Sequence, residues 1–248
     1  VPGTSKSLDD NGVSYIDDFE GSRTTIDVKS QSAWYLASTP QGQLDLFPEG
    51  VLNDSLPYGF NRAKLAWYHI SSDLVRSTSA TPSHLKNDPT QQSNHLVREV
   101  YEQDLFPNRE SETGYATTLP VLNLAFYPTE KGPYNFDVEG LSGISAGIND
   151  QGELLDPESR WGGMMRRLVT NDFEASNIEY IEFWLMDPFV YNEDGQGGDL
   201  YFNLGNISED ILKDSRKSFE QGLPNSEVVE LVDTTAWGRV SLKQSLVY

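Results

Sequence analysis

Short apolar runs separated by polar, glycine- and proline-containing segments constrain the fold of this chain more than any other feature of its sequence. The clearest two, IEYIEFWLM at 178–186 and LYFNL at 200–204, flank an acidic, glycine-rich loop. Valine, isoleucine and aromatic residues bounded by turn-forming residues are typical of β-strands. The same pattern recurs at 24–28, 33–37, 62–70, 119–127, 227–232 and 237–242. Short strands joined by turns predict a mainly β fold, an antiparallel β-sandwich.

Two segments carry helical signals within this β pattern. Near 93–104, apolar residues recur at three- and four-residue spacing, which gives a helix one apolar face. Near 208–221, Ser208 can cap a helix, and Glu209 and Asp210 would favour the positive end of its dipole. We therefore expect two short helical inserts in the sandwich.

The domain organisation follows from composition along the chain. Residues 1–12 are mostly small and polar, which predicts a disordered segment or a linker. Residues 13–248 are enough for a single β-sandwich domain. The polar start of the chain lacks the apolar stretch of a signal peptide, and we expect the chain to be a piece of a larger protein.

The charge balance excludes several classes of partner. The chain has 38 acidic and 18 basic residues and a formal net charge of −20. Such a charge repels nucleic acids and anionic membrane surfaces, so neither is an expected partner. With no cysteine in the sequence, disulfides, thiolate metal sites and cysteine catalysis are also excluded. No apolar run approaches the roughly 20 residues of a membrane-spanning helix.

Several long motifs resemble known proteins. The order of YIDDFEGS, a tryptophan strand, RAKLAWY and DFE before IEYIEFW is similar to the galactose-binding jelly roll of many carbohydrate-binding modules. A closer match is carried by YIDDFEGS, RAKLAWY, YPTEKGPYNF, RWGGMMR, the run from DFEASNIEYIEFWLMDPF, GGDLYFNLGNISEDILKD and FEQGLP. Together these resemble the SprA/Sov family, the outer-membrane translocon of the type nine secretion system in gliding and related bacteria.

The resemblance implies a function that composition cannot give. It implies a non-catalytic, soluble domain of the secretion translocon, attached to the membrane only through the full-length protein. Such a domain would shape or cap the channel and contact other secretion-system proteins or exported cargo. It would lie at the outer membrane, on the extracellular face or in the periplasm. The alternative is a carbohydrate-binding module of a cell-surface protein.

The jelly-roll resemblance also raises a possible structural calcium site. Asp18 and Glu20 are clustered at the start of a predicted strand, where such modules often hold Ca²⁺. Asp233 could add a ligand if the ends of the domain meet, since Ca²⁺ takes six to eight oxygens. The alternative is a solvated acidic edge, and apart from this calcium we expect no cofactor. The acidic loop 192–199 lacks the EF-hand spacing and is predicted to be a flexible connection.

No motif for catalysis stands out, so we do not expect an enzyme. His69, His84 and His95 have no zinc-type spacing, and no nucleophile elbow, phosphate loop or dinucleotide fingerprint occurs. Among the tryptophans, those within apolar runs (Trp34, Trp67 and Trp184) are predicted to lie in the core. Trp161, between an arginine and two glycines, is predicted to be the most exposed.

Overall fold

The computed structural model describes residues 3–5, 14–16, 26–109, 114–170, 172–176, 178–195, 197–215, 226–228, 231–236 and 238–242. Strands and irregular segments make up most of this part of the chain, and helices are short. Every strand pair is antiparallel, and each forms a separate two-stranded sheet. The prediction of a mainly β, antiparallel chain is confirmed at this level. None of the described helices is long and apolar enough to cross a membrane.

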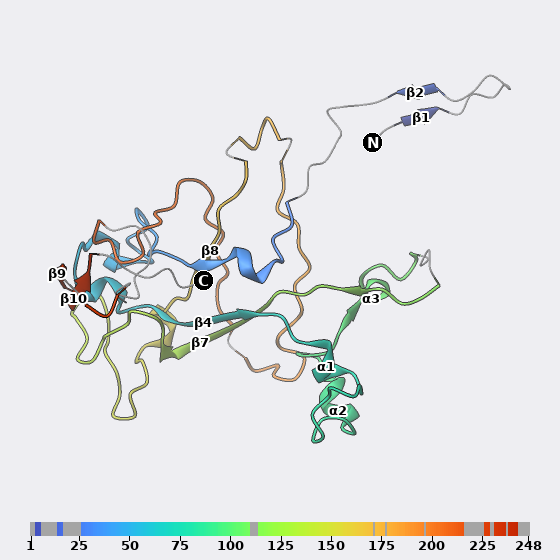
Figure 1. Cartoon of the computed structure of the whole chain (residues 1–248), viewed down its shortest axis with the longest axis horizontal. Helices are drawn as coiled ribbons and strands as arrows, with labels where there is room; N and C mark the ends of the chain where they lie inside the picture. The colour runs from blue at the N-terminus through green and yellow to red at the C-terminus, as the bar shows by residue number, and fades with distance from the viewer. Residues whose placement is uncertain are drawn as a thin grey trace.

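The longest ladder joins β4 (Ala63–Tyr68) to β7 (Asn123–Lys131), which lie side by side through the centre of the molecule (Figure 1). Leu65 pairs with Phe126 and Trp67 with Leu124. The register shifts between Ala63 and Lys64, opposite the stretch of β7 that contains Pro128. Proline has no amide hydrogen to donate to a ladder, so a bulge accommodates it where regular pairing could not.

The remaining strands form short pairs around this ladder. They are β1 (Gly3–Ser5) with β2 (Ser14–Ile16), β3 (Tyr35–Leu36) with β8 (Met164–Met165), β5 (Val100–Tyr101) with β6 (Thr118–Leu119), and β9 (Val232–Thr235) with β10 (Gly238–Ser241). The predicted linker 1–12 therefore overlaps β1, and its other residues lie outside the described part of the chain.

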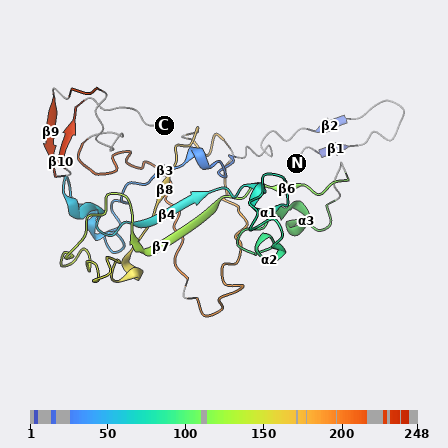
Figure 2. The ribbon, with the colours of Figure 1, turned by 60° about the horizontal axis from the view of Figure 1, so that its bottom comes forward.

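Short helices of about one turn lie in the loops between the strands. The α-helices are α1 (Ser72–Val75), α2 (Pro89–Gln92) and α3 (Glu102–Leu105), and the 3₁₀ turns are η2 (Gln31–Ala33), η3 (Pro48–Val51), η4 (Leu56–Gly59) and η5 (Pro157–Ser159). The three α-helices gather at one end of the β4–β7 ladder, and β9 and β10 lie toward the other end (Figures 1 and 2).

The helix predicted near 93–104 is wrong as a continuous element. Val100 and Tyr101 are extended and pair with Leu119 and Thr118, so β5 interrupts the helical pattern. Only the last residues are helical, where the Asp104 carboxylate accepts the Tyr101 amide at 2.9 Å and caps α3. Strand pairing supplies hydrogen bonds that the local apolar spacing could not anticipate.

The helix predicted near 208–221 is absent from its described part, 208–215. The Asp210 carboxylate accepts the amides of Asp214 (3.2 Å) and Ser215 (2.8 Å), in place of backbone carbonyls. Lys213 and Ser215 also have positive φ values of 54° and 67°, which break a right-handed helix. The rest of that prediction, 216–221, lies outside the described residues.

The two runs that the sequence marks most strongly as strands are not strands in the structure. No described residue of 179–186 or 200–204 takes part in a backbone–backbone hydrogen bond. Figure 1 shows the chain passing the β4–β7 ladder along 178–186, turning, and returning past it along 197–204. Their isoleucine and aromatic residues favour strands, but no described strand pairs with them to complete a ladder.

The buried core is small and largely polar. Its fully enclosed side chains are Arg62, Tyr58, Glu49, Asn61, Thr39 and Asp137. These residues come from η3, η4, the two residues before β4, and the segments that follow β3 and β7. Buried charges are rare unless they are paired and hydrogen-bonded, so this core depends on the partners of each polar group.

Candidate functional site

The predicted calcium ligands are only partly within the described structure. Asp18 and Glu20 lie outside the described residues. Asp233 lies on β9, where its side chain is exposed and its Oδ1 accepts the Thr234 amide at 2.9 Å. Across the residues that the structure describes, no three histidine, aspartate or glutamate side chains are grouped to hold a metal ion. The calcium site stays a prediction.

The acidic loop 192–199 is a turn between the two exposed runs. The Asn192 amide donates to the Phe189 carbonyl at 2.9 Å, and the Gly195 amide donates to the Asn192 carbonyl at 3.0 Å. The Phe189 ring lies against Gly195, where a Cβ would come within 2.7 Å of it. The described part of this loop thus connects the two runs through local hydrogen bonds.

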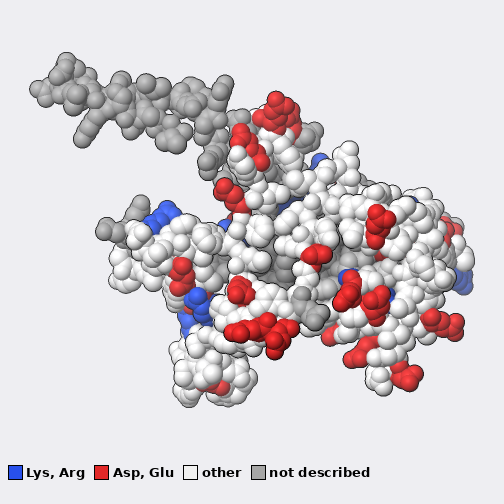
Figure 3. Space-filling view, turned by 180° about the vertical axis from the view of Figure 1, so that it is seen from behind, with Lys and Arg blue, Asp and Glu red and all other residues white. Residues whose placement is uncertain are grey.

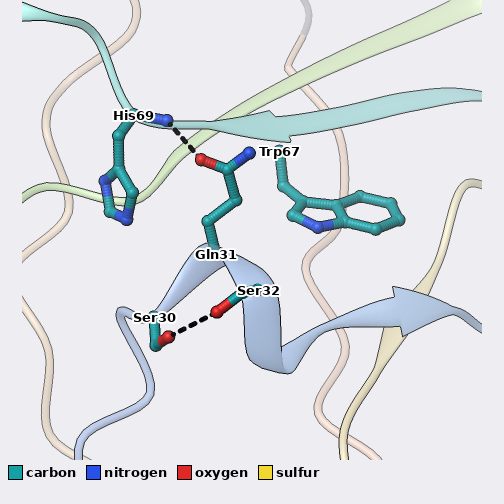
Figure 4. Close-up of a pocket in the computed structure, with 5 residues that line it drawn as sticks. All are labelled: Ser30, Gln31, Ser32, Trp67 and His69. Carbon is teal, nitrogen blue, oxygen red and sulfur yellow. Dashed lines mark hydrogen bonds between the residues drawn. The ribbon is translucent and has the colours of Figure 1, made fainter. Parts of the chain in front are cut away.

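A shallow pocket of about 360 Å³ lies between η2 and the end of β4 (Figure 4). Its lining residues are Ser30, Gln31, Ser32, Trp67 and His69. The Gln31 side-chain oxygen accepts the His69 amide at 3.1 Å, and His69 Nδ1 lies 2.6 Å from the Val121 carbonyl. Trp67 is half-buried beside these polar groups, so it lines a pocket as well as contributing to packing. An aromatic ring beside neutral polar groups can hold a small polar ligand.

A second group of polar residues is sealed from solvent and belongs to the scaffold. Asn61 Nδ2 donates to Glu49 Oε2 at 2.9 Å and to the Ile144 carbonyl at 2.8 Å. Trp161 Nε1 donates to Glu49 Oε1 at 2.6 Å. The prediction that Trp161 is the most exposed tryptophan is wrong, because this hydrogen bond holds its ring, half-buried, against the core.

Two arginines carry the positive charge of this core. Arg62 is fully buried; it donates to the Ala37 carbonyl at 3.1 Å, and its guanidinium lies 5.2 Å from the Trp161 ring. Burial lowers the pKa of Arg62 to about 10, and it raises the pKa of the neighbouring Tyr58 phenol. Arg160 lies 3.6 Å from the Asp137 carboxylate, and both side chains are enclosed. No ligand reaches these groups without unfolding the core around them.

One feature open to a partner is the 178–204 loop. Most of its large apolar side chains are more than two-fifths exposed, among them Tyr180 (73%), Trp184 (66%), Leu185 (73%) and Leu204 (59%), while Ile178 and Phe189 are half-buried. Trp184, predicted to lie in the core, therefore lies on the surface and touches solvent as well as the Phe106 ring, 5.9 Å away. Exposed apolar groups gathered in one segment mark interaction sites more often than isolated ones do.

The same loop is acidic throughout. Between Arg167 and Lys213 the sequence holds ten acidic residues and no basic one, half of the formal net charge of the chain. None of the eight carboxylates from Asp172 to Asp199 forms an ion pair with a described residue. Acidic groups also outnumber basic ones on the face shown in Figure 3. Apolar and acidic groups thus share one exposed segment.

No protein-family model and no curated protein sequence matches this chain.

Proposed function

We propose that this chain is a non-catalytic domain of an outer-membrane protein-export channel of the type nine secretion system, which contacts partner or cargo proteins. The exposed, acidic and apolar 178–204 loop carries the proposal. A domain that works alone buries most of its apolar side chains, whereas a domain within an assembly presents them to its partners. The family motifs that suggest an export channel include this same segment.

The finer fold, an antiparallel sandwich of jelly-roll type, is part of the same proposal. It is supported by the antiparallel sense of every described pair and by the strand-like sequence of the unpaired runs. In a sandwich the β7 side chains Leu124 and Phe126, now 46% and 44% exposed, would pack against a second sheet. Cysteine substitution of Phe126 in the longer protein, followed by thiol labelling, tests this: fast labelling contradicts the sandwich.

The decisive experiment is site-specific photo-cross-linking in living cells. A photoreactive residue at Leu185, on the exposed loop, should form adducts with other export components or with cargo in transit. The same residue at Glu158, exposed on η5, is the control and should form few. If Leu185 forms no adduct with export components in cells whose channel is intact, the export function is overturned.

The pocket beside Trp67 favours a second candidate, a carbohydrate-binding module. The Trp67 ring and neighbouring neutral hydrogen-bonding groups are a chemistry that suits a sugar ring. A glycan array followed by calorimetry tests it. Specific sugar binding that is lost in Trp67→Ala but kept in Trp184→Ala supports the carbohydrate-binding module. An array on which no sugar binds specifically rules that module out. Measurable glycan hydrolysis would instead contradict the non-catalytic part of either proposal.

A further inference from the structure

We propose that the 178–204 loop is a docking site for an extended, basic polypeptide segment, which adds to its backbone as a β-strand. The inference rests on the proposed function, because it names the chemistry of the partner that such a domain would contact. The binding chemistry itself follows from three properties of the loop: free backbone groups, uncovered apolar side chains and a single sign of charge.

The free backbone is the first property. The run 179–186 has no backbone–backbone hydrogen bond in the described structure, although its course is extended (Figure 1). An extended segment with unpaired amides and carbonyls is a template for another strand. Strand addition lets main-chain hydrogen bonds provide affinity while side chains provide selectivity.

The side chains of this run alternate as they do in a strand. The Phe183 ring packs against Phe202 of the returning run, with centroids 5.4 Å apart. The next residue, Trp184, contacts Phe106 instead. Neighbouring residues thus reach different partners, as expected where successive side chains point to opposite sides. The run is therefore arranged for pairing before any partner arrives.

The uncovered apolar area exceeds what an isolated protein surface shows. Five aromatic residues of the loop, Tyr180, Phe183, Trp184, Tyr201 and Phe202, are each more than half exposed. Aromatic side chains have roughly 150–250 Å² to bury, so these five alone leave roughly 400 Å² or more uncovered. Adding Ile181, Leu185, Met186, Leu200 and Leu204 takes the patch beyond the roughly 300–600 Å² that is usual for a monomer.

Charge decides which partner fits. A second copy of this chain would bring the six carboxylates of its own loop against the six already there, and like charges at close range oppose association. Lipid headgroups of negative charge and nucleic acids are disfavoured for the same reason. A segment that carries lysine or arginine among apolar residues would bring its charges close to the Glu179 and Glu182 carboxylates, which are exposed on this run.

The test uses the whole chain and labelled short peptides with blocked ends. The probe alternates lysine and valine. One control alternates glutamate and valine, and another repeats the probe with every backbone amide N-methylated. Fluorescence anisotropy should show that the basic probe binds, that its affinity falls as salt is added, and that both controls bind at least about tenfold more weakly.

Two matched pairs of variants locate the site. Ile181→Pro removes an amide from the free run, and Val169→Pro does the same at a residue that is 98% exposed outside it. Glu179→Gln with Glu182→Gln removes two charges from the run, and Glu153→Gln with Glu158→Gln removes two exposed charges elsewhere. The first member of each pair should weaken probe binding about tenfold, and the second should leave it unchanged. Urea unfolding midpoints should stay the same in all four.

Each contrary result overturns a stated part of the inference. Equal binding of the N-methylated peptide rules out strand addition, and equal binding of the acidic peptide rules out charge selection. If no peptide binds, or if sedimentation shows that the chain covers the loop with its own copies, the docking site is wrong. Leu185 adducts with export components in cells would still support the proposed function in that case. Peptide binding without such adducts would leave the docking chemistry intact and remove the export function.

Discussion

Trp161 donates its indole hydrogen to the carboxylate of Glu49 at 2.6 Å, across 112 residues of sequence. Glu49 is fully buried, and its other carboxylate oxygen accepts the Asn61 amide at 2.9 Å. One glutamate therefore satisfies donors from the start of β4 and from the loop before β8. The free-energy cost of enclosing its charge is offset by these two hydrogen bonds and by the nearby Arg62 guanidinium.

Replacing Glu49 by alanine should destabilise the chain strongly. The substitution removes the acceptor of the Trp161 indole and one of the two acceptors of the Asn61 side-chain amide, and each buried unsatisfied donor costs about 1–3 kcal/mol. We expect the free energy of unfolding to fall by about 2–5 kcal/mol in urea titrations. Glu158→Ala, an exposed glutamate on η5, should change it by less than about 0.5 kcal/mol. Equal effects of the two substitutions would show that the network does not support the fold.

Replacing only Arg160 of the buried Arg160–Asp137 pair should lower the free energy of unfolding more than replacing both residues. Arg160→Met leaves the Asp137 carboxylate enclosed without its cation and should cost about 3–5 kcal/mol of unfolding free energy. Adding Asp137→Asn removes that uncompensated charge, so the double variant should be more stable than Arg160→Met alone. Guanidinium chloride is a salt and would screen the interaction between the two charges, so urea is the denaturant for this comparison. A double variant whose losses simply add would contradict coupling between the two groups.

Alanine at Gly132 should not be tolerated. A Cβ at Gly132 would press on the carbonyl oxygen and carbon of Ala63, which are backbone atoms that cannot turn away. The β4–β7 ladder would have to shift where it meets the core, at a cost of about 2 kcal/mol or more. Gly198→Ala is the matched control, since a Cβ there meets no atom within 4 Å. Thermal melting of both variants measures the difference, and a normal melting temperature for Gly132→Ala would contradict this packing.

Asp104 should make the chain sensitive to acid. The pKa of Asp104 is lowered from 3.8, first by the Tyr101 amide and then by the Arg98 guanidinium. A carboxyl with a lowered folded-state pKa contributes stability above its unfolded value, and this contribution is lost as the pH falls through the folded value. Unfolding free energies measured from about pH 5 to about pH 2 should therefore fall less steeply for Asp104→Asn than for the unaltered chain.

Arg98→Gln tests the order of these causes. It removes only the second cause, so its acid dependence should lie between those of Asp104→Asn and the unaltered chain. If the unfolding free energy of Arg98→Gln depended on pH as weakly as that of Asp104→Asn, the arginine and not the backbone amide would be the main cause of the lowered Asp104 pKa.

The central ladder was predictable because its signal is local. The runs 62–70 and 119–127 overlap β4 and β7; the alternation of the first and the apolar residues of the second are enough to indicate strands. The Glu49 network was not predictable by the same means. Nothing near Glu49 in the sequence distinguishes it from the other acidic residues, because its partners come from distant segments. The arginine and glycines beside Trp161 predict an exposed ring, but its indole donates to the buried Glu49.

In the 178–186 run, a local strand pattern does not lead to a strand in the described structure. Its pattern is as strand-like as that of β4, yet a strand needs a neighbour, and pattern alone does not supply one. The local pattern therefore predicts a core position for Trp184, but the described structure leaves its side chain exposed. The candidate docking surface is therefore the segment whose residues predict a buried strand but which the described structure leaves exposed and unpaired.

The register of the central ladder has one more consequence. Tyr68, the last residue of β4, is the partner of Asn123, the first residue of β7. Residues 69–122, with all three α-helices, therefore leave the ladder and return to it at one point (Figure 2). They form an insertion that evolution could lengthen, shorten or exchange without moving a residue of the ladder, and a tight turn in their place would leave an ordinary β-hairpin.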